Sequence, residues 1–308
     1  MIVIVGPTAV GKSELALQLA QCFPLEILSA DSRQVYRHMD IGTNKPSPAE
    51  RAAVPHHVID VVEPDEDFSL AMYHGLALKA LKAIQQKGKL PLLVGGSGLY
   101  VWSLIEGWTI PQVPPDREMR RWLESRAAQD DSQSLYRELQ AIDPAAAEKI
   151  NPSNIRRIIR ALEIYYATGQ PPSRLQRKEK PCFSVLVIGL TQERSDLYRR
   201  IDWRVDDMIR KGLVEEVQQL LKKGYGPSLP SMSGIGYKQI DQFLRGEMTL
   251  PEAIDRMKYE THRLARHQYA WFRLGDSRIR WFDVSKTEGK ADIVALNEIK
   301  GVIEGFIS

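Results

Sequence analysis

Residues 6–13, Gly6-Pro7-Thr8-Ala9-Val10-Gly11-Lys12-Ser13, match the pattern GxxxxGK[ST] in full, and this match is the strongest indication of the fold. An apolar run, residues 2–5, precedes it, and a stretch with helical spacing continues from Lys12 towards Cys22. The glycines let successive backbone N–H groups and the helix N-terminus point at one anion, while Lys12 adds a charge and Ser13 a metal ligand. A tight strand-to-helix turn without a ligand is the alternative. The complete pattern in this setting favours a diphosphate site.

Apolar runs alternate with helical stretches along the chain, and this alternation predicts an α/β fold with a parallel sheet. Strands are expected at residues 2–5, 25–28, 58–62, 92–94, 184–189 and, as an edge strand, 279–282. Helices are expected at residues 194–223, 251–273 and 291–306. Residues 116–180 are predicted to be mostly helical, which suits an inserted unit. The predicted domains are a P-loop NTPase-like core in residues 1–112 and 183–308, the latter with C-terminal helices, and a helical insertion in residues 113–182.

The composition is typical of a globular enzyme. A chain of 308 residues with 43% hydrophobic residues can bury a full core, and its net charge of +3 is too small to indicate a nucleic-acid partner by itself. Cys22 and Cys182 lie far apart without ligand spacing, so we expect two buried thiols and neither a disulfide framework nor structural zinc. The apolar runs are too short to cross a bilayer, so we expect a cytoplasmic protein without membrane contact.

Three further motifs each allow two interpretations. Asp31 follows the run that ends at Ala30, so it is either a ligand-facing carboxylate at a strand end or the cap of a following helix. The turn Gly95-Gly96-Ser97-Gly98 is either a second anion site or, as its residues alone favour, a close turn that needs positive φ. His56 and His57 would point to opposite faces of a strand, so packing or hydrogen bonding is favoured over a shared metal.

Basic residues cluster in the second half of the predicted insertion. The segment 153–180 holds seven of them against the acids Glu163 and Glu179. Helical spacing puts isoleucines on one side and arginines on another, where the arginines would meet phosphates or only solvent. The basic residues are Arg156, Arg157, Arg160, Arg174, Arg177, Lys178 and Lys180. A second basic stretch, residues 256–273, carries the aromatics Tyr259, Tyr269, Trp271 and Phe272, which we expect in the core.

In order and spacing, these motifs resemble the tRNA dimethylallyltransferase (tRNA isopentenyltransferase) family of the bacterial type. The similarity extends over nearly the whole chain and rests on the P-loop, Asp31-Ser32, residues 39–46, His56-His57, residues 93–100, Arg160-Ala161-Leu162-Glu163 and Gly236-Tyr237-Lys238-Gln239. The resemblance implies that the P-loop holds dimethylallyl diphosphate with Mg²⁺, and that the acceptor is N6 of the adenine just 3′ of the tRNA anticodon. It also implies that the insertion grips the anticodon stem-loop. A monomer is expected.

The resemblance assigns roles to individual residues. It makes Asp31 the proton acceptor and puts Thr8, Lys12 and Arg204 against the diphosphate, although Arg204 alone would be interpreted as a solvated helix residue. Residues 6–13 form the diphosphate cradle, and Ser13 is the metal ligand. The implied tRNA contacts are Asp31, Ser32, Arg33, Gln34, Ser97, Arg120, Arg156, Arg157, Ile158, Ile159, Arg160, Ser233, Gly234, Ile235, Gly236, Tyr237 and Lys238.

Three rival functions share parts of this pattern. A P-loop small-molecule kinase has the same cradle and would bind and turn over ATP. A prenyltransferase for free adenine nucleotides needs no anticodon grip, so the arginine-rich insertion argues against it. A non-enzymatic RNA-binding module would need no carboxylate at Asp31.

Overall fold

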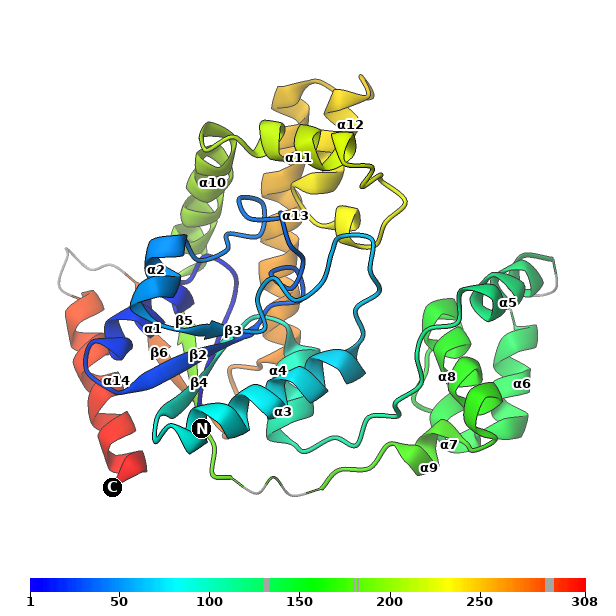
Figure 1. The fold of residues 1–308 in the computed structure, drawn as a ribbon, viewed down its shortest axis with the longest axis horizontal. Coiled ribbons are helices and arrows are strands. Elements are labelled where there is room, and N and C mark those ends of the chain that lie inside the picture. Colours follow the sequence, from blue (N-terminus) through cyan, green and yellow to red (C-terminus); the bar gives the residue numbers. More distant parts are fainter. Residues whose placement is uncertain (130–132, 180, 182, 286–290) are drawn as a thin grey trace. The chain divides into compact units, whose positions relative to one another are not determined.

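The computed structural model describes residues 1–129, 133–179, 181, 183–285 and 291–308. The chain divides into two compact units (Figure 1). We call Met1–Phe68, Gly75–Val101 and Cys182–Ser308 the core unit, and Ser69–His74 with Trp102–Pro181 the helical unit. Among the described residues, no helix has the length and apolar character needed to cross a membrane.

The core unit is built on a parallel sheet of six strands in the order β3-β2-β4-β1-β5-β6. The strands are β1 (Ile2–Val5), β2 (Leu25–Ala30), β3 (His56–His57), β4 (Leu90–Gly95), β5 (Leu186–Thr191) and β6 (Ile279–Asp283). All residues of β1 and β2 are buried, as expected for strands covered on both faces. The predicted parallel α/β sheet is confirmed. Because β2, β4 and β1 are neighbours, the turns after these strands meet at one edge of the sheet.

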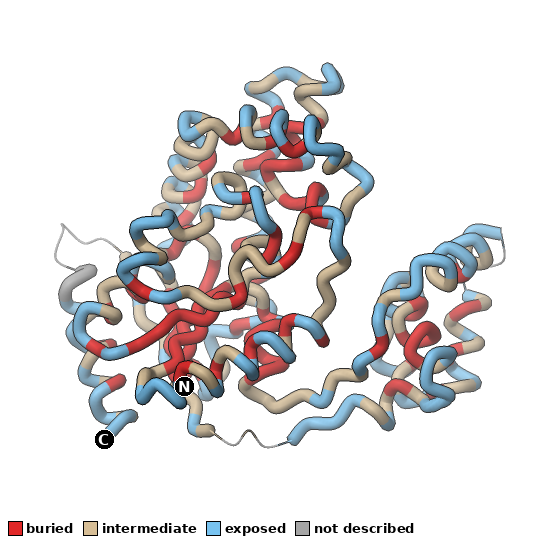
Figure 2. Tube along the Cα trace, in the orientation of Figure 1, coloured by how far each residue is buried: buried red, intermediate tan, exposed pale blue. Residues whose placement is uncertain are grey.

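Helices pack against the sheet through apolar side chains. Figure 2 shows that the buried residues of the core unit gather in and around the strands. Leu15 and Leu19 of α1 join Leu197 and Ile201 of α10 in the buried cluster around β1 and β5. The helices wholly in the core unit are α1 (Lys12–Ala20), α2 (Pro48–Ala53), α10 (Arg194–Arg210), α11 (Leu213–Lys222), α12 (Tyr237–Leu244), α13 (Leu250–Trp271) and α14 (Ala291–Ile307). Two more, α3 (Leu70–Gln86) and α4 (Gly98–Ile105), have residues in both units.

Several expectations for the core unit are wrong in detail. Residues 58–62 do not form a strand, because Val58 and Asp60 have φ angles of 61° and 54°, which extended backbone excludes. The expected helix 194–223 is two helices that separate at Gly212, whose φ is 96°. Cys22 is exposed rather than buried, and Cys182 lies outside the described residues.

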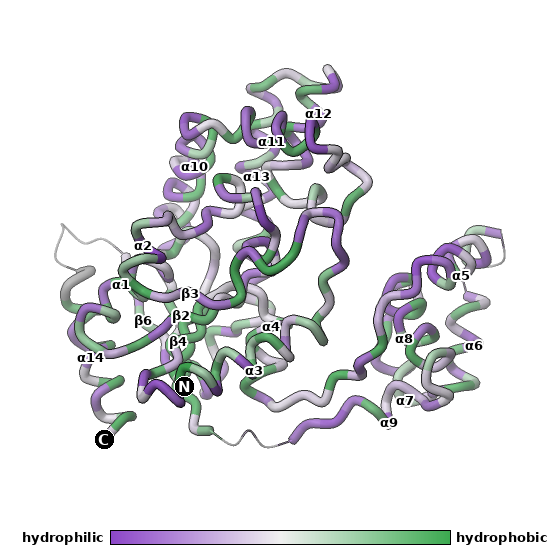
Figure 3. Tube along the Cα trace, viewed as in Figure 1, coloured by the Kyte–Doolittle hydropathy of each residue, from purple (hydrophilic) through white to green (hydrophobic). Residues whose placement is uncertain are grey.

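The helical unit has its own hydrophobic core. Its helices are α5 (Arg117–Gln129), α6 (Ser134–Ile142), α7 (Pro144–Ala147), α8 (Ile155–Thr168) and α9 (Pro172–Leu175). Leu123, Leu135, Leu139 and Leu162 form the centre of the buried cluster. Figure 3 shows that α5 is mainly hydrophilic, and Leu123 is the residue that this helix buries.

Candidate functional site

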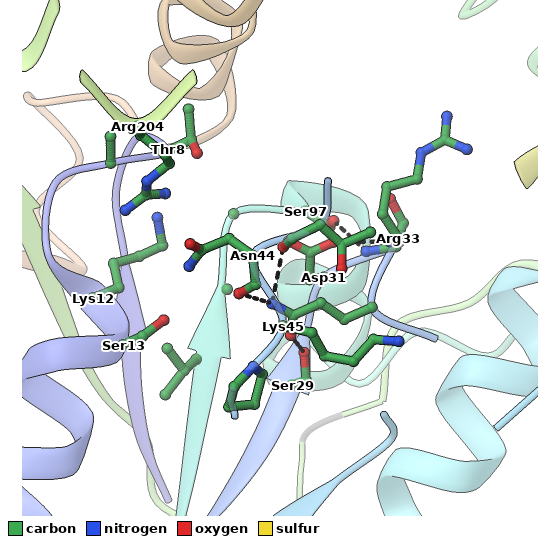
Figure 4. Close-up of a pocket in the computed structure, with 18 of the residues that line it drawn as sticks. Thr8, Lys12, Ser13, Ser29, Asp31, Arg33, Asn44, Lys45, Ser97 and Arg204 are labelled. Atoms are coloured by element: carbon green, nitrogen blue, oxygen red, sulfur yellow. Dashed lines mark hydrogen bonds between the residues drawn. The ribbon is translucent and has the colours of Figure 1, made fainter. Parts of the chain in front are cut away.

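A cavity of about 1010 Å³ lies within the core unit, at the edge of the sheet where β1, β2 and β4 end. It brings together residues that the sequence analysis selected from five separate segments (Figure 4). These are Thr8, Ala9, Gly11, Lys12, Ser13, Asp31, Ser32, Arg33, Gln34, Ser97, Arg204, Ser233, Gly234, Ile235 and Tyr237. A cavity of this size accommodates a small organic diphosphate together with part of a second substrate.

The P-loop has the curled backbone that its sequence predicts. Gly6 has a φ of 139°, and a Cβ at this position would lie 2.4 Å from the carbonyl oxygen of Leu190. Ala9 and Gly11 also have positive φ, at 68° and 105°, and α1 begins directly afterwards at Lys12. Such a curl followed by a helix N-terminus points backbone N–H groups into one concave surface, which favours an anion.

Two cations face the cradle without an acid against them. The side chains of Lys12 and Arg204 point toward the same space (Figure 4). Lys12 Nζ donates to the carbonyl oxygens of Gly6 at 3.0 Å and Pro7 at 2.6 Å. Within the described part of the chain, neither Lys12 nor Arg204 has a carboxylate within ion-pair distance. The pair therefore lacks a counter-anion, and a diphosphate would supply one.

The pKa values of both cations reflect this environment. Burial, and to a lesser extent repulsion by Arg204, lowers the pKa of Lys12 to about 7, while Asp31 opposes the shift. Burial and the nearby Arg200 lower the pKa of Arg204 below its ordinary value. A depressed lysine pKa at a ligand cavity is typical of a site prepared for an anionic ligand.

Asp31 lies at the carboxyl end of β2 and lines the cavity. Its Oδ1 accepts a hydrogen bond of 2.8 Å from the backbone N–H of Arg33. Residues 31–46, all of them described, contain no helix, so the interpretation of Asp31 as a helix cap is wrong. The turn fixes the carboxylate beside the second glycine turn, because Ser97 Oγ accepts from the backbone N–H of Ser32 at 3.1 Å.

The second glycine turn needs its glycines for close packing. A Cβ on Gly95 would lie 2.2 Å from the carbonyl oxygen of Ala30, and one on Gly98 would lie 2.3 Å from the ring of Trp271. Gly95, Gly96 and Gly98 are all described, and none adopts positive φ. The expected close turn is present, but the reason given for it was wrong.

Arg33 and Gln34 bind other parts of the core unit. Arg33 donates to the carbonyl oxygens of Pro230 at 2.8 Å and Ser231 at 3.3 Å, and to Ser233 Oγ at 3.3 Å. Gln34 Oε1 accepts from Ser29 Oγ at 3.0 Å. These side chains therefore position the loops at the cavity, whatever else they contact.

Tyr237 is predicted to contact tRNA, but its side chain is only 1% exposed. Its hydroxyl donates to Glu216 Oε1 at 2.7 Å, and Glu216 Oε2 also accepts from the backbone N–H of Ile41 at 2.8 Å. Tyr237 therefore holds a cavity loop, and its contact with tRNA stays a prediction. By contrast, Ser233 and Lys238 in the same segment are exposed.

The predicted RNA contacts in the helical unit differ in exposure and pairing, and they fall into three kinds. Arg156 and Arg157 are exposed in the first turn of α8. Ile158 and Ile159 are buried in the core of the unit, so the contacts predicted for these side chains are wrong.

Arg120 and Arg160 are the third kind, because they pair with the buried carboxylate of Glu163. The Nε of Arg120 lies 2.9 Å from Glu163 Oε1, and Arg160 contacts Glu163 Oε2. Burial raises the pKa of Glu163, but hydrogen bonds from Arg120 and Arg160 outweigh it and hold the pKa below the ordinary value.

The remaining predictions for aromatic and histidine residues have mixed outcomes. Phe272 is buried as expected, but Tyr259 is 63% and Trp271 is 40% exposed. His56 Nδ1 lies 2.7 Å from the carbonyl oxygen of Val54, and His57 Nε2 lies 2.7 Å from Glu26 Oε2. The expected hydrogen-bonding role of the two histidines is confirmed.

The donor set for a metal at the cradle is small. The exposed Ser13 lies at the start of α1 and lines the cavity. Among the described residues, no group of three or more histidine, cysteine, aspartate or glutamate side chains could hold a metal ion. The residues fit Mg²⁺ bound mainly by diphosphate oxygens and water, which is how this ion binds in many phosphate sites.

Three supporting positions were not singled out in the sequence: Glu216 and Gln268 in the core unit, and Glu163 in the helical unit. Glu163 pairs with predicted RNA contacts, Glu216 binds loop amides, and Gln268 contacts both glycine turns. Glu216 and Gln268 make these contacts to residues distant in sequence, so no local pattern indicates them. Glu163 contacts the distant Arg120 but also Arg160, three residues before it, so the motif that contains both could have indicated this pair.

Comparison with known proteins identifies related sequences. Residues 34–275 match the model of the IPP transferase family. A tRNA dimethylallyltransferase of Thermomicrobium roseum is 50% identical over 286 residues, which cover 93% of this chain and 87% of the relative. One from Desulforudis audaxviator is 49% identical over 306 residues, covering 99% and 97%.

Solved structures agree with the sequence relatives. A full-length tRNA isopentenylpyrophosphate transferase of Bacillus halodurans is 41% identical, with a TM-score of 0.70 and coverage of 99% of this chain and 96% of that one. A eukaryotic dimethylallyltransferase acting on tRNA is 31% identical, with a TM-score of 0.85 and coverage of 100% and 79%.

Proposed function

The chain belongs to the IPP transferase family, and from this premise we propose that it transfers a dimethylallyl group from dimethylallyl diphosphate to tRNA. The acceptor is N6 of the adenosine just 3′ of the anticodon. In the reaction N6 bonds to C1 of the dimethylallyl group, the C1–O bond breaks, and diphosphate leaves. The observation that carries this proposal is the pair of cations without a counter-anion beside a strand-end carboxylate in one cavity.

The donor end of the reaction belongs to the P-loop. Cleavage of the C1–O bond leaves negative charge on the diphosphate, and Lys12, Arg204 and the amides of the curled loop already point at that charge. Thr8 lies against the same group. Ser13 would hold Mg²⁺, which neutralises diphosphate charge when bound.

The acceptor end belongs to Asp31. The exocyclic amine of adenine is a weak nucleophile because its lone pair is delocalised into the ring, so a carboxylate that accepts the N6 proton accelerates attack. The base must leave the stacked anticodon loop to reach the cavity, at a cost of about a few kcal/mol. Contacts to the RNA from Ser32, Ser97, Ser233 and Lys238 in the core unit, and from Arg156 and Arg157 in the helical unit, offset this cost. A tRNA acceptor also favours a cytoplasmic location.

The test is transfer of a labelled dimethylallyl group to an unmodified anticodon stem-loop in the presence of Mg²⁺. We expect N6-dimethylallyl adenosine at the position 3′ of the anticodon after nuclease digestion. Parallel reactions replace the stem-loop with AMP, or the donor with ATP and candidate small acceptors. Prenylated AMP without prenylated RNA would favour the free-nucleotide enzyme, and ATP turnover with transfer of phosphate would favour a kinase.

Asp31→Asn tests the proposed proton acceptor. The substitution keeps the size of the side chain, so tRNA affinity should stay within about twofold while transfer falls about 10²- to 10⁴-fold. Filter binding and single-turnover transfer measure the two quantities separately. Transfer at the wild-type rate would remove Asp31 from this role.

A further inference from the structure

Gln268 of α13 contacts both glycine turns of the cavity. Its Oε1 accepts a hydrogen bond of 2.7 Å from the backbone N–H of Thr8, in the P-loop. Its Nε2 donates a bond of 3.1 Å to the carbonyl oxygen of Gly96, in the second turn. The side chain is 8% exposed, so these two bonds satisfy a largely buried amide.

The two turns leave room for this contact. A Cβ on Gly96 would lie 2.1 Å from Gln268 Nε2, so only glycine lets the amide reach the carbonyl. One helical turn further, Trp271 packs where a Cβ of Gly98 would be. The helix α13 thus packs closely along the second turn, and Gln268 is the side chain that extends from it to the P-loop.

The second glycine turn is also hydrogen-bonded to the residues on either side of Asp31. Ser97 N–H donates to the carbonyl oxygen of Ala30 at 3.1 Å, and Ser97 Oγ accepts from the N–H of Ser32 at 3.1 Å. Asp31 lies between these two bonded residues. A continuous chain of hydrogen bonds and covalent links therefore runs from Thr8 through Gln268 and Gly96 to the residues on either side of Asp31.

We propose that Gln268 is a positioning residue that fixes the diphosphate cradle relative to the carboxylate Asp31. This inference rests on the function proposed above. Transfer needs the donor carbon and the acceptor nitrogen at near-attack distance, and misplacement of one by about 1 Å costs up to about 10²-fold in rate. Gln268 also accepts the hydrogen bond of the Thr8 backbone N–H. This N–H therefore orients the loop, and the phosphate is bound by the backbone amides that follow Thr8.

Two substitutions separate this role from a merely structural one. Gln268→Ala removes both bonds, and we expect kcat to fall about 10- to 100-fold while tRNA affinity is unchanged. Gln268→Glu keeps the acceptor for Thr8 N–H but, when ionised, presents a second acceptor to the Gly96 carbonyl. Protonation of that carboxyl restores a donor. Burial at this position raises the pKa of the carboxyl above its ordinary value of about 4.3, so the ratio of Gln268→Glu to wild-type kcat should rise as the pH falls from 8 toward 5.

Gln192→Glu is the matched control. Gln192 is also 8% exposed, and within the described residues it has no hydrogen bond to either turn. The same isosteric change there should leave kcat and KM within about twofold of wild type, with a flat ratio across pH. Thermal unfolding of each variant, measured in parallel, confirms that the proteins are folded at the assay temperature.

The outcomes distinguish the inference from the function on which it rests. If wild-type protein transfers the group and Gln268→Ala does so with unchanged kcat, the positioning role is wrong and the function stands. An unchanged kcat of Gln268→Glu at pH 8, where the carboxyl is ionised, also overturns it. If a negative charge near the cradle were the only cause of the Glu effect, the neutral Ala variant would be as active as wild type. If wild-type protein transfers nothing, the function itself fails.

Discussion

The cradle of the core unit and the arginines of the helical unit use positive charge in opposite ways. In the cradle, Lys12 and Arg204 lie together without a carboxylate against either of them, and the pKa of each is lowered. In the helical unit, Arg120 and Arg160 share the buried carboxylate of Glu163, whose pKa is lowered instead. The cradle cations thus remain available for an anion, whereas the paired arginines already have one.

This difference shows that charge counts alone do not identify a binding site. In the sequence, Arg160 was counted in the basic segment 153–180 with Arg156 and Arg157, and the family resemblance added Arg120 to them as a tRNA contact. A cation that is removed from water and has no counter-anion destabilises the fold, so its presence in a cavity indicates that it binds an anionic ligand. A cation paired to a buried acid stabilises the fold, and a role in RNA binding is then secondary.

The largest expected effect comes from the cradle. Lys12→Met removes a cation that faces the departing diphosphate, so kcat/KM for the donor should fall about 10³-fold in steady-state transfer assays. The temperature of unfolding should not fall, because the substitution removes a partly buried charge that has no counter-anion. A variant that transfers normally, or that is inactive only because it unfolds, would contradict the claim that Lys12 serves the diphosphate rather than the stability of the fold.

The opposite result is expected for Glu163→Gln in the helical unit. Loss of this carboxylate leaves Arg120 and Arg160 without their partner, and because both side chains are about one-third exposed, the free energy of unfolding of this unit should fall by about 1–2 kcal/mol. Hydrogen exchange of the α5 and α8 amides measures the change. Diphosphate affinity should be unchanged.

The pairing of Glu163 also predicts an acid dependence. Because the folded pKa is lowered, the stabilisation is present above the pKa of the unfolded carboxyl and is lost as the pH falls through the folded one. Glu163→Gln should lack that dependence. Glu138→Gln is the control, because Glu138 forms a more exposed pair with Arg126 and should cost less than about 1 kcal/mol. Equal losses in both variants would contradict the structural role.

A smaller effect is expected where arginines are exposed. Arg156→Gln and Arg157→Gln should each weaken binding of the stem-loop a few-fold and reduce the slope of log K against log salt by about 0.7–0.9. Arg126→Gln, in the same unit, should leave the slope unchanged because Arg126 pairs with Glu138 and lies over the ring of Trp122. A slope insensitive to all three substitutions would show that this face does not meet phosphates.

The sequence predicted the residues that line the cavity better than the residues that hold its loops in place. The eight-residue pattern and the rule that ligands gather at strand ends were enough to bring Lys12, Ser13 and Asp31 to one edge. Gln268 could not be predicted, because its partner Thr8 lies 260 residues away and an isolated glutamine in a helix has no signature. Likewise, the burial of Tyr237 depends on Glu216, which belongs to another helix.

Errors in the fold have similar causes. Residues 58–62 have the apolar composition of a strand, but tertiary contacts hold Val58 and Asp60 at positive φ. Asp60 accepts from Lys45 at 2.6 Å, a lysine whose side chain is only 1% exposed. An ion pair between separate segments, in which Lys45 is buried, thus accompanies the irregular backbone, and single-sequence patterns do not capture such a contact.

Proton uptake on diphosphate binding tests most directly the claim that Lys12 and Arg204 lack a counter-anion until a diphosphate binds. With a pKa of about 7, Lys12 is mostly neutral at pH 8 in the free protein and becomes charged when an anion binds beside it. Calorimetry with Mg²⁺-diphosphate, in buffers of different ionisation enthalpy, should show uptake of nearly one proton at pH 8 beyond that of Lys12→Arg, and little excess at pH 6. Equal uptake by wild type and Lys12→Arg at both pH values would contradict the account.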